Sequence, residues 1–265
     1  MKPFHLLLIN SLSLIITLLV NYLGGTGAYL GKSVGEISSL YPTTITPAAY
    51  AFSIWGLIYL GLIAFLIYQW YTYYSGKPSV SIIPTGLWLT LANIFNACWI
   101  WAWTSEYILL SALLISLLLL ALIRLVIRLR LELYDAPLQV IFWVWWPISI
   151  YTGWIVLATV LNISVWIQNS GFLAETWSEG TWAGLILIVA SLIYTGLTYL
   201  RNMREAALVG VWGFVAIGMK QWEALPSIGI LSVVLAAMLF FIAMLHGYKN
   251  RKTSPMAKIL DNKQG

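Results

Sequence analysis

The chain has 265 residues, of which 61% are hydrophobic and 9% are charged, and its formal net charge is +5. Because a soluble domain is about one quarter charged, this composition excludes a water-soluble fold and predicts an all-α integral membrane protein. With one cysteine and two histidines, the chain cannot form an internal disulfide or a multi-histidine metal site.

Eight apolar segments are predicted to be transmembrane helices, for which about 17 to 25 residues are typical. In chain order they are Pro3–Gly24, Pro47–Tyr73, Pro84–Trp103, Tyr107–Leu129, Leu138–Gln168, Thr181–Leu200, Ala206–Met219 and Ser227–Tyr248. The first is predicted to be retained, because a cleaved signal peptide has a shorter apolar core. The fifth contains Pro147, and the seventh is short and rich in glycine.

The lysines and arginines predict how these helices are oriented. Of the 14 such residues, only Lys32 and Lys220 fall on one side of an eight-span topology, and the other twelve fall on the side of both termini. Basic residues favour the cytoplasmic side of a membrane, so both termini are expected in the cytoplasm. Topology thus accounts for the positive charge, and no nucleic-acid partner is predicted.

Two connecting segments stand out between and after the predicted spans. The loop Gly25–Thr46 is the longest and is rich in glycine. Long loops of this kind are often lids, and a plain exposed connector is the alternative. The tail, residues 249–265, is polar and basic and is predicted to be a disordered cytoplasmic segment.

The predicted spans contain no Asp, Glu, Lys or Arg near their centres. Ion-coupled carriers usually bury such a group, so charge-coupled transport is disfavoured. The sequence also lacks a phosphate loop, a nucleophile elbow and an HExxH helix, so no enzyme is predicted. His5 and His246 are expected to pack near the membrane surface, with a two-histidine heme clamp as the alternative. Cys98 is expected to be a small buried side chain.

Three of the predicted helices carry aromatic and amide side chains along one face. The residues recur at three- or four-residue spacing, which places them within an arc of about 120° or less on each helix. They are Trp55 and Tyr59 on the second segment, Asn93, Asn96, Trp99 and Trp103 on the third, and Trp143, Pro147, Tyr151, Trp154, Ala158 and Asn162 on the fifth.

If the three faces converge, they enclose an apolar cavity suited to a flat or bulky hydrophobic molecule. The rings would stack on such a ligand, and Asn96 or Asn162 could orient it. Ordinary helix packing is the alternative for the tryptophans, and interhelical hydrogen bonding is the alternative for the asparagines.

Three motifs on these faces occur in order along the chain. The second segment opens on a proline and carries W-x-x-x-Y, here Pro47, Trp55 and Tyr59. The third carries N-x-x-W, here Asn96 and Trp99, and the fifth carries Y-x-x-W-x-x-x-A-x-x-L-N, here Tyr151, Trp154, Ala158, Leu161 and Asn162. Together the motifs resemble the TspO/MBR family of tryptophan-rich sensory proteins, which includes the peripheral benzodiazepine receptor and has a proline where Ile150 stands.

The resemblance covers about residues 1–168 and implies a TspO-like five-helix membrane domain. Residues 169–248 would then form three additional transmembrane helices, followed by the tail. It also implies a receptor or sensor for a porphyrin, sterol or similar hydrophobic molecule, with Gly25–Thr46 as the lid. The ligand-binding residues it implies are Trp55, Tyr59, Asn96, Trp99, Trp103, Tyr151, Trp154, Ala158 and Asn162.

The same resemblance implies no required cofactor, although a tetrapyrrole or heme is a candidate bound ligand. The implied partners are this hydrophobic small molecule, the lipid bilayer and, as in many family members, a second copy of the chain in a homodimer. The implied location is a bacterial inner membrane. Two other functions stay open: a transporter or permease component for a small lipophilic or peptide solute and, ranked last, an enzyme that photo-oxidises a tetrapyrrole.

The chain also departs from the family pattern. Ala51 stands where the family often has phenylalanine, Ser53 stands where it often has proline, and the long loop lacks W-Y-x-x-L-x-K-P. These departures and the extra helices indicate a long, divergent bacterial branch. The extra helices are expected to cover the face that short members use for dimerisation.

Overall fold

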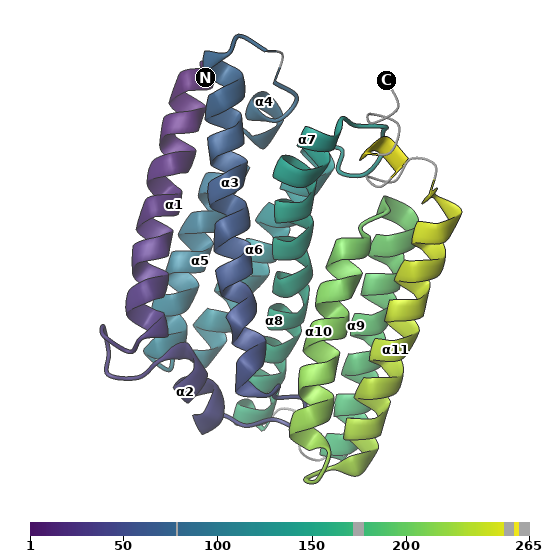
Figure 1. Ribbon diagram of the computed structural model, residues 1–265. Coiled ribbons are helices and arrows are strands. Elements are labelled where there is room, and N and C mark those ends of the chain that lie inside the picture. The colour runs from purple at the N-terminus through teal and green to yellow at the C-terminus, as the bar shows by residue number, and fades with distance from the viewer. Residues whose placement is uncertain (78, 172–177, 252–256, 260–265) are drawn as a thin grey trace.

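The computed structural model describes residues 1–77, 79–171, 178–251 and 257–259, and these residues form helices and connecting loops without a β-strand. Eight long helices account for most of the chain, as the sequence predicts (Figure 1). They are α1 (Pro3–Gly25), α3 (Ile54–Tyr74), α5 (Trp88–Thr104), α6 (Ile108–Arg128), α8 (Trp146–Ser170), α9 (Glu179–Arg201), α10 (Arg204–Gln221) and α11 (Pro226–Lys249).

Five short helical segments join the long helices. They are α2 (Val34–Leu40), the 3₁₀ helix η1 (Ala49–Ser53), α4 (Ile82–Thr85), α7 (Leu138–Val140) and the π-helix η2 (Ile141–Trp145). Helix α2 lies inside the loop Gly25–Thr46, where no helix was predicted. It begins with a capping box, in which the Ser33 side chain accepts from the Glu36 amide and the Glu36 side chain accepts from the Ser33 amide.

Six stretches are long and apolar enough to cross a membrane: Pro3–Gly25, Ala49–Tyr74, Ile108–Arg128, Leu138–Ser170, Glu179–Arg201 and Pro226–Lys249. The two other long helices, α5 and α10, run alongside them (Figure 1). Helix α5 has only 17 residues, and α10 carries charged residues at both ends, namely Arg204, Glu205 and Lys220. The protein is therefore an all-α membrane protein.

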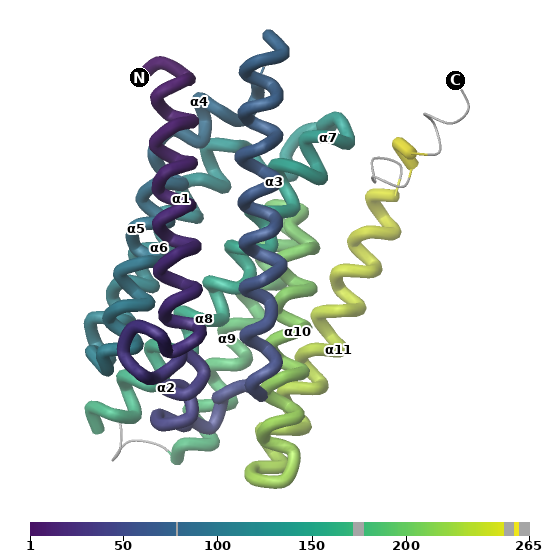
Figure 2. Tube along the Cα trace, turned by 60° about the vertical axis from the view of Figure 1, so that its left-hand side comes forward, coloured from purple at the N-terminus to yellow at the C-terminus, as the bar shows by residue number. Residues whose placement is uncertain are grey.

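Successive long helices alternate in direction, so both termini lie at the same end of the bundle (Figure 1). Helices α1, α3, α5, α6 and α8 form one group, and α9, α10 and α11 form a second group beside α8 (Figures 1 and 2). One continuous core of buried apolar side chains extends through both groups. Lys32 lies in the connection after α1 and Lys220 lies in the last turn of α10, both at the end opposite the termini.

Helix α8 joins the two groups because it approaches α10 closely. A Cβ added at Gly153 would lie 2.8 Å from the Ala206 Cα atom, and one added at Gly213 would lie 2.0 Å from a methyl group of Leu157. Small residues allow helix backbones to come together in this way. The glycines of the seventh predicted span allow close packing on three sides of α10, since Gly213 meets Leu157 of α8, Gly210 meets Tyr194 of α9 and Gly218 meets Val233 of α11.

The π-helix η2 changes which side chains share a face with α8. Pro147 has no amide hydrogen to bond the carbonyl of Trp143, and its ring crowds that carbonyl, so a regular α-helix is disfavoured there. The wider π turn shifts the helical register, and Trp143 is 46% exposed. The prediction that Trp143 shares the buried face of Tyr151 and Trp154 is therefore wrong.

The predicted tail is described only in part, because residues 252–256 and 260–265 lie outside the described residues. In the described part, Lys258 Nζ forms an ion pair with Asp135 and donates to the Ala136 carbonyl at 2.8 Å. The tail thus contacts the loop between α6 and α7.

Candidate functional site under the loop between α1 and α3

The aromatic faces of α3, α5 and α8 converge on Trp55, as the sequence analysis expected. The Trp55 ring stacks on Tyr59 at 5.4 Å and on Trp99 at 5.9 Å between centroids. It meets Tyr151 and Trp154 edge to face, each at 6.2 Å. Both geometries are favourable for aromatic pairs.

The amide side chains link these rings to neighbouring helices. Asn96 donates to the Tyr151 hydroxyl at 3.0 Å and accepts from Asn21 at 2.6 Å, which joins α1, α5 and α8. The Asn162 Oδ1 atom accepts from Trp99 Nε1 at 3.1 Å and from the Ser111 hydroxyl at 3.2 Å. These bonds support the interhelical role considered for both asparagines. They also satisfy polar groups that would be costly if left unpaired in the bilayer.

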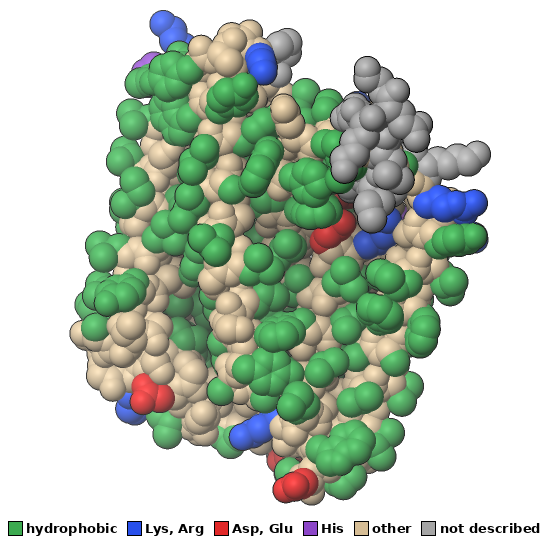
Figure 3. Space-filling view, in the orientation of Figure 1, with side chains coloured by type: hydrophobic (Ala, Val, Ile, Leu, Met, Phe, Trp, Pro, Cys, Tyr) green, Lys and Arg blue, Asp and Glu red, His purple; other side chains and the backbone are tan. Residues whose placement is uncertain are grey.

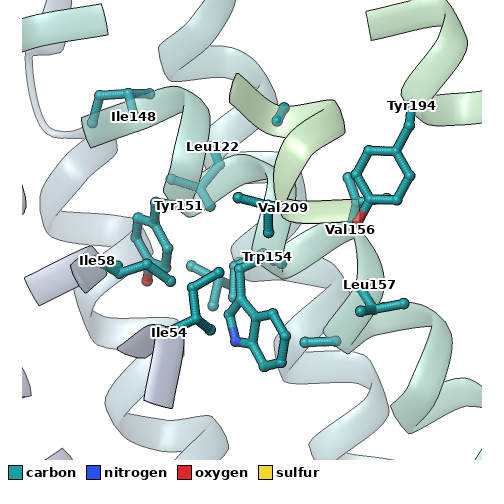
Figure 4. Close-up of a cluster of buried hydrophobic side chains, with 14 of the residues drawn as sticks. Ile54, Ile58, Leu122, Ile148, Tyr151, Trp154, Val156, Leu157, Tyr194 and Val209 are labelled. Atoms are coloured by element: carbon teal, nitrogen blue, oxygen red, sulfur yellow. The ribbon is translucent and has the colours of Figure 1, made fainter. Parts of the chain in front are cut away.

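Trp154 is the most enclosed indole of the cluster. It is 1% exposed, and Figure 4 shows its ring, with that of Tyr151, next to Ile54 and Ile58 of α3. Phe52 meets it edge to face at 6.1 Å. The Trp154 Nε1 atom has no hydrogen-bond partner among the described residues, so the cluster contains a buried donor that an incoming acceptor could use.

The space between the rings is small. A void of about 30 Å³ lies beside Trp55, Trp99, Trp103, Trp154 and Ala158, and such a volume accommodates about one water molecule. An open cavity was predicted from the sequence, but the rings pack against one another and leave only this void. No planar macrocycle fits in this closed arrangement.

The loop between α1 and α3 closes the void from one end. Val34 and Ser38 of α2, together with Thr43, Thr46 and Pro47, complete its lining. The loop is attached to α5 through the Val34 carbonyl, which accepts from Trp103 Nε1 at 3.1 Å. It is attached to α10 through the Ala48 amide, which donates to the Ala216 carbonyl at 3.0 Å.

A surface ion pair adds a further attachment of this loop. Lys32 Nζ lies 2.9 Å from the Glu106 carboxylate, which also accepts from the Tyr41 hydroxyl at 2.9 Å. The hydrogen bonds from Lys32 and Tyr41 lower the pKa of Glu106. Because all three groups are largely solvated, this attachment is weak and reversible.

Two other residues singled out from the sequence lie apart from the cluster. His5 packs against Phe4 and His246 packs against Tyr199, and their helices, α1 and α11, lie at opposite edges of the bundle (Figures 1 and 2). The two histidines therefore do not face one another across a shared site. Cys98 is exposed, so the prediction of a buried cysteine is wrong.

The sequence analysis missed two members of the hydrogen-bond network, Asn21 and Ser111. A signal was present for Asn21, because an asparagine in an apolar span usually bonds to another helix. Its partner on α5 could not be chosen without knowing how the helices pack.

Fold and site together define an all-α integral membrane protein with a tryptophan-rich, amide-linked cluster beneath a loop. The chain belongs to the TSPO-like protein family, whose model matches residues 7–245. This match confirms the resemblance drawn from the motifs, and it continues through α9 and α10 into α11. Comparisons with curated proteins and with solved structures give no match.

Proposed function

We propose that this protein is a TspO-like membrane receptor or sensor that takes up a hydrophobic, planar ligand between the rings around Trp55. A porphyrin or a sterol is the ligand class that family membership favours. The observation that carries the proposal is the convergence of Trp55, Tyr59, Trp99, Tyr151 and Trp154 beside one void.

Uptake of such a ligand requires the rings and the loop to move, because the void holds only about one water molecule. The loop is suited to this movement, since an exposed ion pair and a small number of hydrogen bonds attach it. Displacing it would uncover Trp103, whose indole donates to the loop, and the void beyond.

The energy balance is compatible with moderate affinity. Each good aromatic contact contributes about 0.5–1.5 kcal/mol beyond simple burial. The affinity observed is the intrinsic affinity reduced by the fraction of molecules in the open state. Trp154 Nε1 would favour ligands that carry a carbonyl or carboxylate at the buried end.

The proposal is tested by titrating the full-length protein in maltoside micelles with protoporphyrin IX and following the Soret band. We expect saturable binding that Trp154→Ala weakens about two- to tenfold, because one aromatic contact is lost. The control is Trp143→Ala, which removes an indole that is 46% exposed and outside the cluster.

An equal effect of both substitutions, or binding that does not saturate, would argue against this site. Two further measurements separate the alternative functions. Uptake of the porphyrin into proteoliposomes would favour transport, and light-dependent loss of the porphyrin that requires Trp154 would favour photo-oxidation.

A further inference from the structure

A second cavity lies at the opposite end of the bundle, where both termini are found. Its volume is about 400 Å³, and it is enclosed by the loop after α6, the π-helix η2, the turn between α9 and α10, and the end of α11. It differs from the aromatic void in having acidic and basic side chains in its lining. Figure 3 shows acidic and basic side chains side by side in this region, surrounded by hydrophobic ones.

Glu132 is a buried carboxylate in the wall of this cavity. It is 9% exposed, and its Oε1 atom has no hydrogen-bond partner among the described residues. Its other oxygen accepts a long bond of 3.4 Å from Asn202. Burial raises the pKa of Glu132, and the nearby Glu205 carboxylate raises it further.

The backbone holds both partners of that long bond in an unusual conformation. Glu132 has φ 59° and Asn202 has φ 58°, which is the left-handed region that residues other than glycine enter at a cost. Asn202 is the C-cap of α9, where asparagine often adopts this conformation, whereas Glu132 adopts it in the loop after α6. These conformations bring two loops from distant parts of the sequence together at this cavity.

The cations of the cavity form no direct ion pair with its buried carboxylates among the described residues, although the nearby Arg204 charge opposes the rise that burial causes in the pKa of both Glu132 and Glu205. The two ion pairs within the described residues are Lys32–Glu106 and Lys258–Asp135, so neither includes Glu132 or Glu205. Arg201 donates to the Val126 carbonyl at 3.0 Å. The Nε atoms of Arg201 and Arg204 are both buried, with no partner among the described residues. Acidic and basic side chains that each have a buried atom without a hydrogen-bond partner therefore line the same space.

An apolar groove adjoins the polar cavity. Its volume is about 560 Å³, and it lies between α3, α8 and α10, with Ile54, Leu57 and Leu208 in its wall. Trp146 and Glu205 line both the groove and the cavity. Along α10 the groove extends from Glu205 to Trp212, which is about 10 Å of helix.

We propose that the cavity and the groove together bind one membrane lipid with a zwitterionic headgroup. The ammonium group would lie beside Glu132 and Glu205, and the phosphate would accept from Arg201 and Arg204. The acyl chain would occupy the groove. Acidic and basic groups with unsatisfied hydrogen-bonding atoms call for a headgroup that carries both an ammonium and a phosphate, and the adjoining apolar groove favours a lipid over a free zwitterion. The polar cavity lies at the opposite end of the bundle from the loop over the aromatic void, whereas the groove reaches Ile54, which lies beside Trp154 (Figure 4). The proposal does not depend on the function proposed for the aromatic cluster.

Native mass spectrometry of the full-length protein in maltoside tests the proposal with three probes. The first is lysophosphatidylethanolamine, which has both the zwitterionic headgroup and a chain. The second is lysophosphatidylglycerol, which has the chain and the phosphate but no ammonium group. The third is glycerophosphoethanolamine, which has the headgroup without a chain. We expect one bound lysophosphatidylethanolamine, with an affinity at least tenfold above that of either other probe.

Two substitutions then locate the site. Glu132→Gln should weaken lysophosphatidylethanolamine about tenfold, whereas the control Glu106→Gln, at the other end of the bundle, should not. Leu208→Trp fills the groove from a position that is 37% exposed. It should weaken the binding of lysophosphatidylethanolamine without changing the weak binding of glycerophosphoethanolamine. If Glu132→Gln does not fold, this second variant still tests the proposal.

Three results would overturn the proposal. Equal binding of the two lysolipids would show that the ammonium group is not recognised, and hence that Glu132 and Glu205 do not select the headgroup. Binding of glycerophosphoethanolamine as tight as that of the lysolipid would indicate a free zwitterion as the ligand. Unchanged binding in both the Glu132 and the Leu208 variants would place the lipid elsewhere.

Discussion

The bond between Trp99 and Asn162 predicts a measurable coupling between α5 and α8. In Asn162→Leu, Trp99 Nε1 loses its acceptor at 3.1 Å, whereas the Ser111 hydroxyl keeps its bond to the Ile108 carbonyl at 2.8 Å. One buried donor is therefore left unpaired, at a cost of about 1–3 kcal/mol. Interhelical bonds in membranes tend to be weaker, about 0.6 kcal/mol on average, so we expect a loss of about 1–2 kcal/mol.

The assay is reversible unfolding in mixed detergent micelles, followed by circular dichroism, in a double-mutant cycle with Trp99→Phe. Phenylalanine has no donor to leave unpaired, so Asn162→Leu should cost about 1 kcal/mol less in that background. The comparison substitution is Trp101→Phe, because Trp101 is 41% exposed. Additive effects of Asn162→Leu and Trp99→Phe, within about 0.5 kcal/mol, would refute the coupling.

Three further outcomes are expected. Ala158→Leu places a larger side chain in the wall of the void and should abolish porphyrin binding, measured by the Soret titration; undiminished binding would move the ligand elsewhere. Glu106→Gln should lower the protection of amide hydrogens from exchange across the loop 26–48, and acid should lower it in the unmodified chain when the rates are divided by the slower intrinsic exchange at that pH; protection that is equal in both proteins would argue against this attachment. Because the folded pKa of Glu106 is lowered, this attachment is present above pH 4.5 and is lost as the pH falls through the folded value. Gly153→Ala should lower stability by about 1–3 kcal/mol through overpacking against Ala206, whereas Gly56→Ala, which meets open space, should not; equal unfolding midpoints for the two variants would contradict the close α8–α10 contact.

Much of the fold is predictable because the bilayer restricts what a membrane chain can do. Each span must satisfy its own backbone hydrogen bonds, so apolar length alone predicts a helix. The eight predicted helices are present with small shifts at their ends. The helical period also predicted that Trp55, Tyr59 and Trp99 lie on inward faces, since it depends only on spacing.

The candidate site was only partly predictable. Spacing selected the rings, but the distance between helices decides whether rings enclose a cavity or pack together. The close contact of Trp55 with Trp99 leaves a void of about 30 Å³. Spacing also misplaced Trp143, because the π turn before Pro147 interrupts the regular period. Helix α2 was missed because it is short and lies in a glycine-rich loop.

The lining of the polar cavity could not be predicted from the sequence, because its residues come from distant segments. Glu132, Arg204 and His246 lie far apart in the sequence, in segments that sequence analysis treats as separate connections or helix ends. Charge counting places Arg204 at the end of the bundle that holds both termini, because basic residues follow topology, but it does not place Glu132. Their meeting in one cavity depends on α10 packing against α8 and on the backbone conformations of Glu132 and Asn202.

The sequence by itself therefore determined the membrane class, the number of long helices, the placement of both termini at the same end, and the faces that carry aromatic rings. These properties follow from local composition and from a period of 3.6 residues. Only the tertiary structure decided which rings touch, how much space remains between them, and which charged side chains of distant loops share a cavity. Those outcomes are set by distances between helices, to which residues from all parts of the chain contribute at once.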